Sequence, residues 1–287
     1  MAGPACVDQP APLRSITPSP ATSAHPLEAA AAPRPAPRVD ASSPPTLLPD
    51  AQAEVAGPPL RPFTHLSADD RVTGLARVAL AERNKRTVVE SLFAEAGVAF
   101  PPAELLLRGF KAERELEVWA SSEPGAAMRP IARYTICAAS GDLGPKRREG
   151  DRQVPEGYYH ASYLWPNSAF FLALKVSYPN VSDRRLGDRR MPGGDIMIHG
   201  GCASIGCLAM SDERIQEIYL MANATKARHD IAIHLYPTRD PQSLVDHEAY
   251  EEHRDFWRNL YEGHALFEAT HRPPAVEVGV DGRYRYR

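Results

Sequence analysis

The ten residues Ile198-His199-Gly200-Gly201-Cys202-Ala203-Ser204-Ile205-Gly206-Cys207 place one histidine, two cysteines and three glycines in a single short stretch. An imidazole within hydrogen-bond reach of a thiol activates it, as in the cysteine enzymes that transfer acyl groups. His199 and Cys207 are eight residues apart, which is about 26 Å in a fully extended chain. The segment must therefore double back, which glycine permits. We predict that Cys207 is a nucleophile and that His199 is its base.

The glycines of this stretch also predict how a substrate would approach. Gly206 would let a substrate carbonyl come close to the backbone, where the N–H of Cys207 could hold the developing oxyanion. A helix predicted to begin at Ser211 would direct its positive end toward the same region and favour a thiolate.

Two other interpretations of the stretch stay open on these residues alone. Cysteine is among the most buried residue types, so the pair could be structural. His199, Cys202 and Cys207 could also be three ligands of a zinc site. A closed zinc site usually needs a further ligand at short spacing, and His229 and His234 point to opposite faces of a predicted strand. The glycines and the following helix favour catalysis.

The composition of the 287-residue chain excludes several classes of protein. Its net charge of −3 gives no electrostatic footprint for nucleic acid. Four cysteines are too few for a disulfide-dense scaffold. The longest apolar run, residues 169–174, is far shorter than the ~20 residues of a membrane-spanning helix. We expect no integral membrane segment and no nucleic-acid partner.

Residues 1–62 have a composition of their own. They contain 15 of the 28 prolines, and no aromatic residue precedes Phe63. Such a stretch cannot bury enough apolar surface to fold, so we predict a disordered Pro/Ala-rich tail or tether. The five residues ahead of Cys6 leave no room for the apolar segment of a secretory signal, so no export signal is visible in the sequence as written.

From residue 63 onward the patterns predict short strands and amphipathic helices. Helical spacing of apolar residues and good capping residues predict helices over 69–96, from 211 to at least 222, and over 249–261. Compact or β-branched runs predict strands over 105–111, 116–120, 131–137, 170–176, 196–198 and 231–236, with a loop over 141–157. Strands outnumber helices, so we predict an α+β fold with a curved mixed sheet or β-sandwich and peripheral helices.

Several motifs together resemble the L,D-transpeptidase catalytic domain family (YkuD type). Ile198-His199-Gly200 followed by Ser204-Ile205-Gly206-Cys207 is similar to the family's His-Gly and Ser-His-Gly-Cys signature. Val154-Pro155-Glu156-Gly157-Tyr158-Tyr159 resembles an upstream family loop. Tyr178-Pro179-Asn180 and the spacing of Cys202 are closest to the YafK-like murein L,D-transpeptidase/amidase branch. The resemblance covers about 105–287, which gives a helical lead-in over 63–102 and a catalytic domain over 103–287.

The resemblance implies roles for individual residues. Cys207 would be the nucleophile and His199 the base, with the backbone at Gly200, Gly201 and Gly206 orienting the imidazole and forming the oxyanion site. Cys202 would be a neighbour and not the attacker. Further substrate-binding positions are expected in the matching motifs and on nearby cations: Ser204, Arg133, Lys146, Tyr159 and Asn180.

Two departures from the family pattern matter for substrate binding. Ile205 replaces the usual histidine, so that alternative base is absent. Ala209 replaces a common arginine, so a substrate carboxylate must find another cation. Arg133, Lys146, Arg184 and Arg185 are the candidates.

The resemblance also implies the reaction. The thiolate would attack the diaminopimelate carbonyl of a peptidoglycan stem peptide, expel D-Ala and form a thioester, which an amine resolves to make a crosslink or to attach a lipoprotein. Water in place of the amine would make the protein an amidase that releases wall-anchored lipoprotein, and a catalytically silent wall-binding module is the non-enzymatic alternative. We expect a periplasmic or cell-envelope location, with no metal and no cofactor. One hypothesis is that Cys202 and Cys207 form a disulfide in an oxidising compartment if the loop brings them close, which would silence the site. Cys137 is expected to be simply buried.

Overall fold

The computed structural model describes residues 68–226, 231–245 and 247–287. Its helices are α1 (Ala68–Ala96), α2 (Val181–Leu186), α3 (Ser211–Lys226), α4 (Gln242–Val245), the 3-10 helix η1 (Glu248–His253) and α5 (Arg254–Thr270). Its strands are β1 (Glu104–Phe110), β2 (Glu115–Ser121), β3 (Arg129–Thr135), β4 (Gly157–Ser168), β5 (Phe171–Val176), β6 (Met197–His199), β7 (Leu208–Ala209), β8 (Ile231–Tyr236), β9 (Val276–Val278) and β10 (Tyr284–Tyr286). The predicted tail over 1–62 lies outside the described residues.

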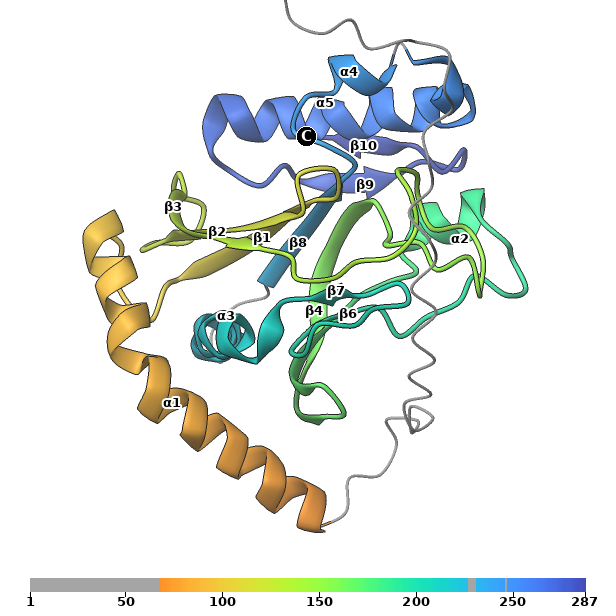
Figure 1. Cartoon of the computed structure of the whole chain (residues 1–287). Coiled ribbons are helices and arrows are strands. Elements are labelled where there is room, and N and C mark those ends of the chain that lie inside the picture. The colour runs from red at the N-terminus through yellow and green to blue at the C-terminus, as the bar shows by residue number, and fades with distance from the viewer. Residues whose placement is uncertain (1–67, 227–230, 246) are drawn as a thin grey trace, which may run out of the picture. The chain divides into compact units, whose positions relative to one another are not determined.

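Eight strands form one mixed sheet in the order β3-β2-β1-β8-β4-β5-β6-β7 (Figure 1). The β1–β8 and β6–β7 pairs are parallel and the other pairs are antiparallel. The sheet curls strongly, because Ala138, just past β3 at one end of the order, bridges Ala209 of β7 at the other end. The predicted α+β class with a curved mixed sheet and peripheral helices is confirmed.

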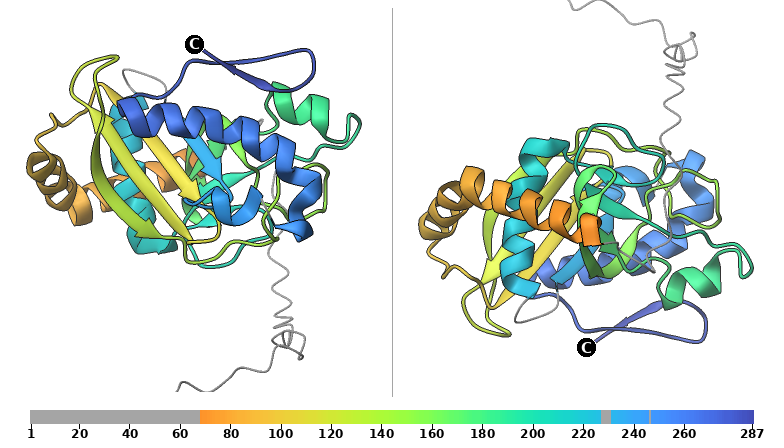
Figure 2. Two further views of the ribbon diagram at one scale, coloured as in Figure 1. Left: turned by 90° about the horizontal axis from the view of Figure 1, so that it is seen from above. Right: turned by 90° about the horizontal axis from the view of Figure 1, so that it is seen from below.

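Helices cover both faces of the central strands (Figure 2). On one face, α1 and α3 pack against each other and against the sheet. The main apolar core lies between these two helices and the strands. Val89 and Phe93 of α1 are fully buried in this core together with Ile215 of α3. The helix over the lead-in therefore contributes to the same core as the strands.

The other face carries a second, aromatic core beneath α5. Trp257 and Leu260 of α5 pack there against Phe110 of β1 and Tyr236 of β8. The alternation of side chains along a strand explains the division, since neighbouring residues of one strand point to opposite faces.

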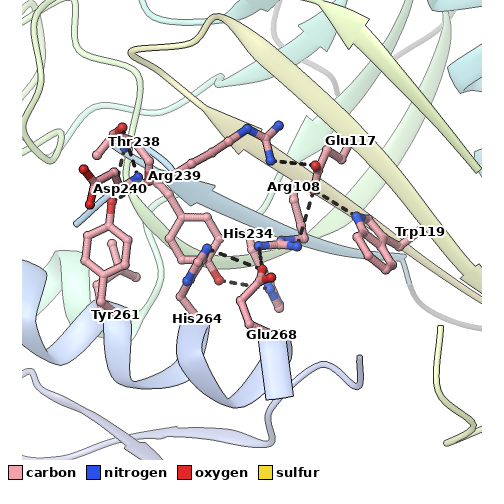
Figure 3. Close-up of polar contacts among 12 residues, drawn as sticks. Arg108, Glu117, Trp119, His234, Thr238, Arg239, Asp240, Tyr261, His264 and Glu268 are labelled. Carbon is pink, nitrogen blue, oxygen red and sulfur yellow. Dashed lines mark hydrogen bonds and ion pairs between the residues drawn. The ribbon is translucent and has the colours of Figure 1, made fainter. Parts of the chain in front are cut away.

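A buried arginine stands at the edge of the aromatic core (Figure 3). Arg108 is only 2% exposed and pairs with Glu117 at 3.3 Å and with Glu268 at 2.5 Å. Burial, followed by the positive charge of Arg108, lowers the pKa of His234 to about 3 and that of His264 to about 4. Both imidazoles are therefore neutral near pH 7, which avoids placing further positive charge beside the guanidinium.

Most predicted elements are present with shifted ends. The hairpin of β1 and β2 and strand β8 lie where the sequence places them, and α1 is one continuous helix. The long strand β4 was missed, and the loop predicted to include Gly157 ends one residue earlier. Its bulged pairing with β5 explains the omission, because residues that leave the regular register do not alternate in polarity.

Candidate active site

The sheet register places Cys207 and His199 on one face. Cys207 immediately precedes β7, which runs parallel to β6 with Leu208 beside Ile198, so Cys207 stands beside Met197. His199 follows Met197 by two residues and therefore shares its side of the strand. Cys207 packs against a small apolar cluster made of Trp165, Ala173 and Met197. Ala173 of this cluster is the cross-strand partner of His199 on β5. The segment between the two residues thus doubles back as predicted.

The turn between β6 and β7 begins with a glycine in a crowded position. A Cβ atom on Gly200 would lie 2.6 Å from the carbonyl oxygen of Phe170 and 2.6 Å from Asp212 Oδ1. The N–H of Gly201, which has a left-handed φ of +67°, donates to the same Asp212 oxygen at 2.7 Å. The turn is therefore fastened to the first turn of α3.

His199 is 2% exposed and its ring is held from two sides. Its Nδ1 lies 2.5 Å from the carbonyl oxygen of Gly200, and its ring stacks on Phe170 with centroids 4.5 Å apart. Only a protonated Nδ1 can donate to a carbonyl, so the neutral ring presents Nε2 as an acceptor. Burial lowers the pKa of His199, while the bond to Gly200 acts in the opposite direction.

Cys207 is the free cysteine among the described residues. Burial raises the pKa of its thiol to about 11. Its S–H donates to the carbonyl oxygen of Asp195 at 3.6 Å. Both shifts favour the neutral forms, a thiol and an imidazole, over a thiolate–imidazolium ion pair.

Ser204 organises the backbone in front of the thiol. Its hydroxyl oxygen accepts hydrogen bonds from the N–H of Cys207 at 2.9 Å and from the N–H of Gly206 at 3.2 Å, and the hydroxyl donates to the carbonyl of Cys207 at 2.7 Å. Gly206 has φ +129°, which a side chain would disfavour. The N–H predicted to bind the oxyanion is occupied by Ser204 in this structure.

A disulfide joins Cys202 to Cys137. The hypothesis that Cys202 pairs with Cys207 is wrong, and so is the expectation that Cys137 is merely buried. The curl of the sheet explains both corrections, because it brings the residues after β3 to β7, next to the glycine turn. Cys202 is consequently neither a competing thiol nor a ligand for the zinc site considered above.

The remaining predicted substrate-binding residues lie in structural contacts. Lys146 is 6% exposed and pairs with Asp151 at 2.5 Å, and Arg133 on β3 pairs with Glu117 at 3.2 Å. Tyr159 is buried and donates to Asp183, which it meets at 3.0 Å.

Helix α2 holds the last group of candidates. Asn180 caps this helix by accepting from the N–H of Asp183. Arg184 and Arg185 occupy its last turn, and Arg185 donates to the carbonyls of Val278 and Gly279. Among the candidate cations, Lys146 acts on Cys207, since its positive charge lowers the pKa of the thiol against the larger effect of burial.

Sequence reasoning missed three residues of this site. Asp212 binds the glycine turn, Asp195 accepts from the thiol, and Lys175 on β5 forms an ion pair with Asp195. A signal existed only for Asp212, which follows the predicted helix start directly. Asp195 and Lys175 are 20 residues apart and meet only because β5 and β6 pair.

Similarity to known proteins identifies the family to which this sheet and site belong. The model of the L,D-transpeptidase catalytic domain (YkuD) matches residues 111–227. YafK of Escherichia coli strain K12, which is provisionally named an L,D-transpeptidase, is 37% identical over 179 residues, covering 61% of this chain and 70% of YafK. The chain therefore belongs to the L,D-transpeptidase catalytic domain family. YafK of Escherichia coli O157:H7 matches with the same values.

Two solved structures are also similar. The helical cell shape determining protein Pgp2 from Campylobacter jejuni matches with a TM-score of 0.38 and 13% identity, covering 67% of this chain and 80% of Pgp2. Bd1075 of Bdellovibrio bacteriovorus matches with a TM-score of 0.35 and 19% identity, covering 57% of this chain and 56% of Bd1075. Across the described part of the chain, no helix combines the length and apolar character that a membrane crossing requires.

Proposed function

We propose that this protein is a peptidoglycan L,D-transpeptidase that acts by cysteine acyl transfer on the diaminopimelate carbonyl of a stem peptide. The observation that carries the proposal is the placement of a free thiol, Cys207, on the same sheet face as His199, whose Nδ1 is tied to Gly200. Membership of the family supports peptidoglycan as the substrate. The proposal includes action in the cell envelope, where that polymer lies.

The first step transfers a proton from sulfur to nitrogen. The S–H of Cys207 turns from the Asp195 carbonyl toward Nε2 of His199, which accepts the proton as sulfur attacks the substrate carbonyl carbon. Because the thiol and the imidazole are both neutral at rest, His199 acts as a general base during the attack. The C–N bond to D-Ala then breaks, and the imidazolium gives its proton to the leaving amine, which leaves a thioester on Cys207.

The developing oxyanion needs hydrogen-bond donors. The N–H groups of Gly206 and Cys207 converge on the single hydroxyl oxygen of Ser204. A substrate oxygen that takes the place of this hydroxyl would meet both donors, and a negatively charged oxygen would bind them more strongly than a hydroxyl does.

The thioester is resolved by an acceptor. An amine of a second stem peptide, deprotonated by His199, would give a crosslink, and an amine of a wall-anchored lipoprotein would give an attachment. Water would give hydrolysis at the same site through the same proton transfers. We place transfer ahead of hydrolysis because the family takes its name from transfer.

Mass analysis of products from purified muropeptides tests the proposal. We expect a covalent adduct on Cys207 that carries the mass of the stem after loss of D-Ala, followed by a crosslinked dimer. A product carrying water would identify a hydrolase, and the absence of any adduct would leave a binding module. Cys207→Ala should abolish turnover, whereas Cys202→Ala, combined with Cys137→Ala as a matched control, should retain it. Loss of activity in the folded Cys137→Ala/Cys202→Ala variant alone would overturn the assignment of Cys207.

A further inference from the structure

An ion pair borders the nucleophile on the β5 side. Lys175 of β5 pairs with the carboxylate of Asp195. The main-chain carbonyl of the same Asp195 accepts the hydrogen bond from Cys207 at 3.6 Å. One residue therefore touches the reactive sulfur with its backbone and holds the ion pair with its side chain.

The sheet register places Lys175 on the same face of the sheet as Cys207 and His199. Ala173 of β5 faces His199 and Lys175 faces Met197. Residues two apart on a strand share a face, so Lys175 lies on the same face as the catalytic pair. Lys175 and Cys207 thus both neighbour Met197, one from β5 and the other from the start of β7.

This ion pair is open to solvent, in contrast to its neighbour. The Lys175 side chain is 23% exposed and that of Asp195 is 52% exposed, whereas Lys146 and Asp151 in the adjacent loop are 6% and 12% exposed. Asp195 also has φ +53°, in the left-handed region that non-glycine residues seldom adopt. The fold thus holds an accessible carboxylate next to the nucleophile at some conformational cost.

We propose that Lys175 and Asp195 form the subsite that recognises the zwitterionic side-chain end of diaminopimelate, an inference that rests on the proposed function. The third residue of the stem carries an ammonium and a carboxylate on the carbon at the end of its side chain. Lys175 binds that carboxylate and Asp195 binds that ammonium, while the carbonyl at the other end of the residue meets Cys207.

The charge balance explains why such a subsite would prefer a stem with diaminopimelate over a stem with L-lysine. Binding the zwitterion replaces one ion pair of the protein with two intermolecular pairs, so every charge keeps a partner of opposite sign. A stem with L-lysine at this position supplies the ammonium alone and offers no carboxylate to Lys175. The diaminopimelate stem therefore gains a charge-assisted contact with Lys175 that the L-lysine stem lacks.

Both charges also act on the thiol. Burial is the main cause of the raised pKa of Cys207, and beyond it Asp195 raises and Lys175 lowers this pKa. A change at either position could therefore alter reactivity without affecting recognition, and the experiment must separate the two effects.

The experiment compares three tetrapeptide stems on the full chain. They carry meso-diaminopimelate, the same residue with its side-chain carboxylate amidated, or L-lysine. We expect Lys175→Met to lower kcat/KM for the diaminopimelate stem by about 10- to 100-fold and to change the other two by less than about threefold. Asp195→Asn should lower all three, since each carries the ammonium. Arg86→Met, in an exposed ion pair with Glu90 within α1, serves as the matched control.

Two further measurements show whether Lys175 acts by binding the substrate or by changing the reactivity of the Cys207 thiol. The rate of alkylation of Cys207 by iodoacetamide reports reactivity in the absence of substrate, and calorimetry with Cys207→Ala reports binding in the absence of reaction. Equal losses on all three stems in Lys175→Met, in step with slower alkylation, would overturn the inference. If the wild-type protein turns over none of the stems, the proposed function fails. In that case binding by the Cys207→Ala variant still tests the subsite. Tighter binding of the diaminopimelate stem than of the other two, lost when Lys175→Met is added, would uphold the subsite. Equal binding of all three stems would refute it.

Discussion

The hydroxyl of Ser204 closes a three-residue turn on Cys207, accepting from its N–H at 2.9 Å and donating to its carbonyl at 2.7 Å. The side chain three residues before Cys207 therefore fixes the backbone on both sides of the Cys207 Cα atom. The serine of the family signature thus shapes the turn that carries the thiol, and its oxygen occupies the position where two N–H groups converge.

Replacing Ser204 separates its contribution to stability from its contribution to catalysis. We expect Ser204→Ala to lower the free energy of unfolding by about 1–2 kcal/mol, because two N–H groups lose their acceptor. It should also lower kcat by about tenfold or more, because the donors are no longer held in place. Urea denaturation and product formation from muropeptides measure the two effects. Ser140→Ala, which removes an exposed hydroxyl bonded to the Arg152 carbonyl, is the control. Full activity in Ser204→Ala would show that the turn holds its shape without the hydroxyl.

The two adjacent glycines of the turn should differ in their tolerance of alanine. In Gly200→Ala the new Cβ would lie 2.6 Å from the carbonyl oxygen of Phe170, which is backbone and cannot move aside easily. In Gly201→Ala the nearest atom is Phe170 Cδ1 at 3.4 Å, and the cost is mainly the left-handed φ of +67°, about 1 kcal/mol.

We therefore expect Gly200→Ala to lower activity by about 100-fold or more, since a displacement of about 1 Å at the base has effects of that order. Gly201→Ala should retain most of its activity. Parallel measurement of the melting temperature and of kcat/KM distinguishes them, and the reverse order of severity would contradict the described turn.

The protonation states of the pair predict the pH dependence. His199 must be neutral to accept the proton, and burial lowers its pKa below the usual value near 6.5, so activity should persist below pH 6.5 before it declines. The pKa of Cys207, raised by burial to about 11, predicts that its alkylation by iodoacetamide increases with pH up to that region. An alkylation rate that is already constant at pH 7 would indicate a preformed thiolate. The His199→Gln variant should lose the acidic limb of the activity profile along with most of the activity.

The disulfide between Cys137 and Cys202 predicts that its removal lowers stability and leaves the proposed nucleophile, Cys207, in place. It closes a segment with a sequence separation of 65 residues, for which loop-closure entropy predicts a stabilisation of about 4 kcal/mol at most. Cys137→Ala, Cys202→Ala and the double variant should unfold at similar, lower denaturant concentrations, as should the reduced wild-type protein. Additive losses from the two single variants would contradict the bond. The double variant should keep the Cys207-dependent activity.

The buried imidazoles near Arg108 predict sensitivity of the fold to acid. The folded-state pKa values of His234, about 3, and His264, about 4, lie below the unfolded value near 6.5. The unfolded chain therefore binds more protons in this range, so stability is fully present above pH 6.5 and declines as the pH falls toward 4. Between pH 7 and pH 5 each such histidine should cost about 2 kcal/mol.

Urea unfolding at the two pH values measures this effect. His264→Gln should lose less stability than the wild type between pH 7 and pH 5, by about the amount assigned to one histidine. His160→Gln, at an exposed position on β4, is the control and should follow the wild type. An unchanged pH dependence in His264→Gln would show that this imidazole is already protonated in the fold.

The sequence by itself determined the elements whose signals are local. Compact or β-branched runs located β1, β2 and β8, and helical spacing located α1, α3 and the apolar face of α5. The glycines around His199 and Cys207 required a reversal of the chain, because an extended segment could not bring an imidazole to a thiol. Long-range pairing left no such local signal, so β4, with its bulges, was missed.

Only the tertiary structure decided which distant residues meet at the site. The closure of the curled sheet through Ala138 and Ala209 brings Cys137 to Cys202 and leaves Cys207 as the single thiol of the described site. The pairing of β5 with β6 brings Lys175 to Asp195 beside the thiol. Burial, which depends on packing and not on residue type, set the thiol and the imidazole to their neutral forms. Each of these properties arises from contacts between segments far apart in the chain, whose identity a linear pattern of residues does not contain.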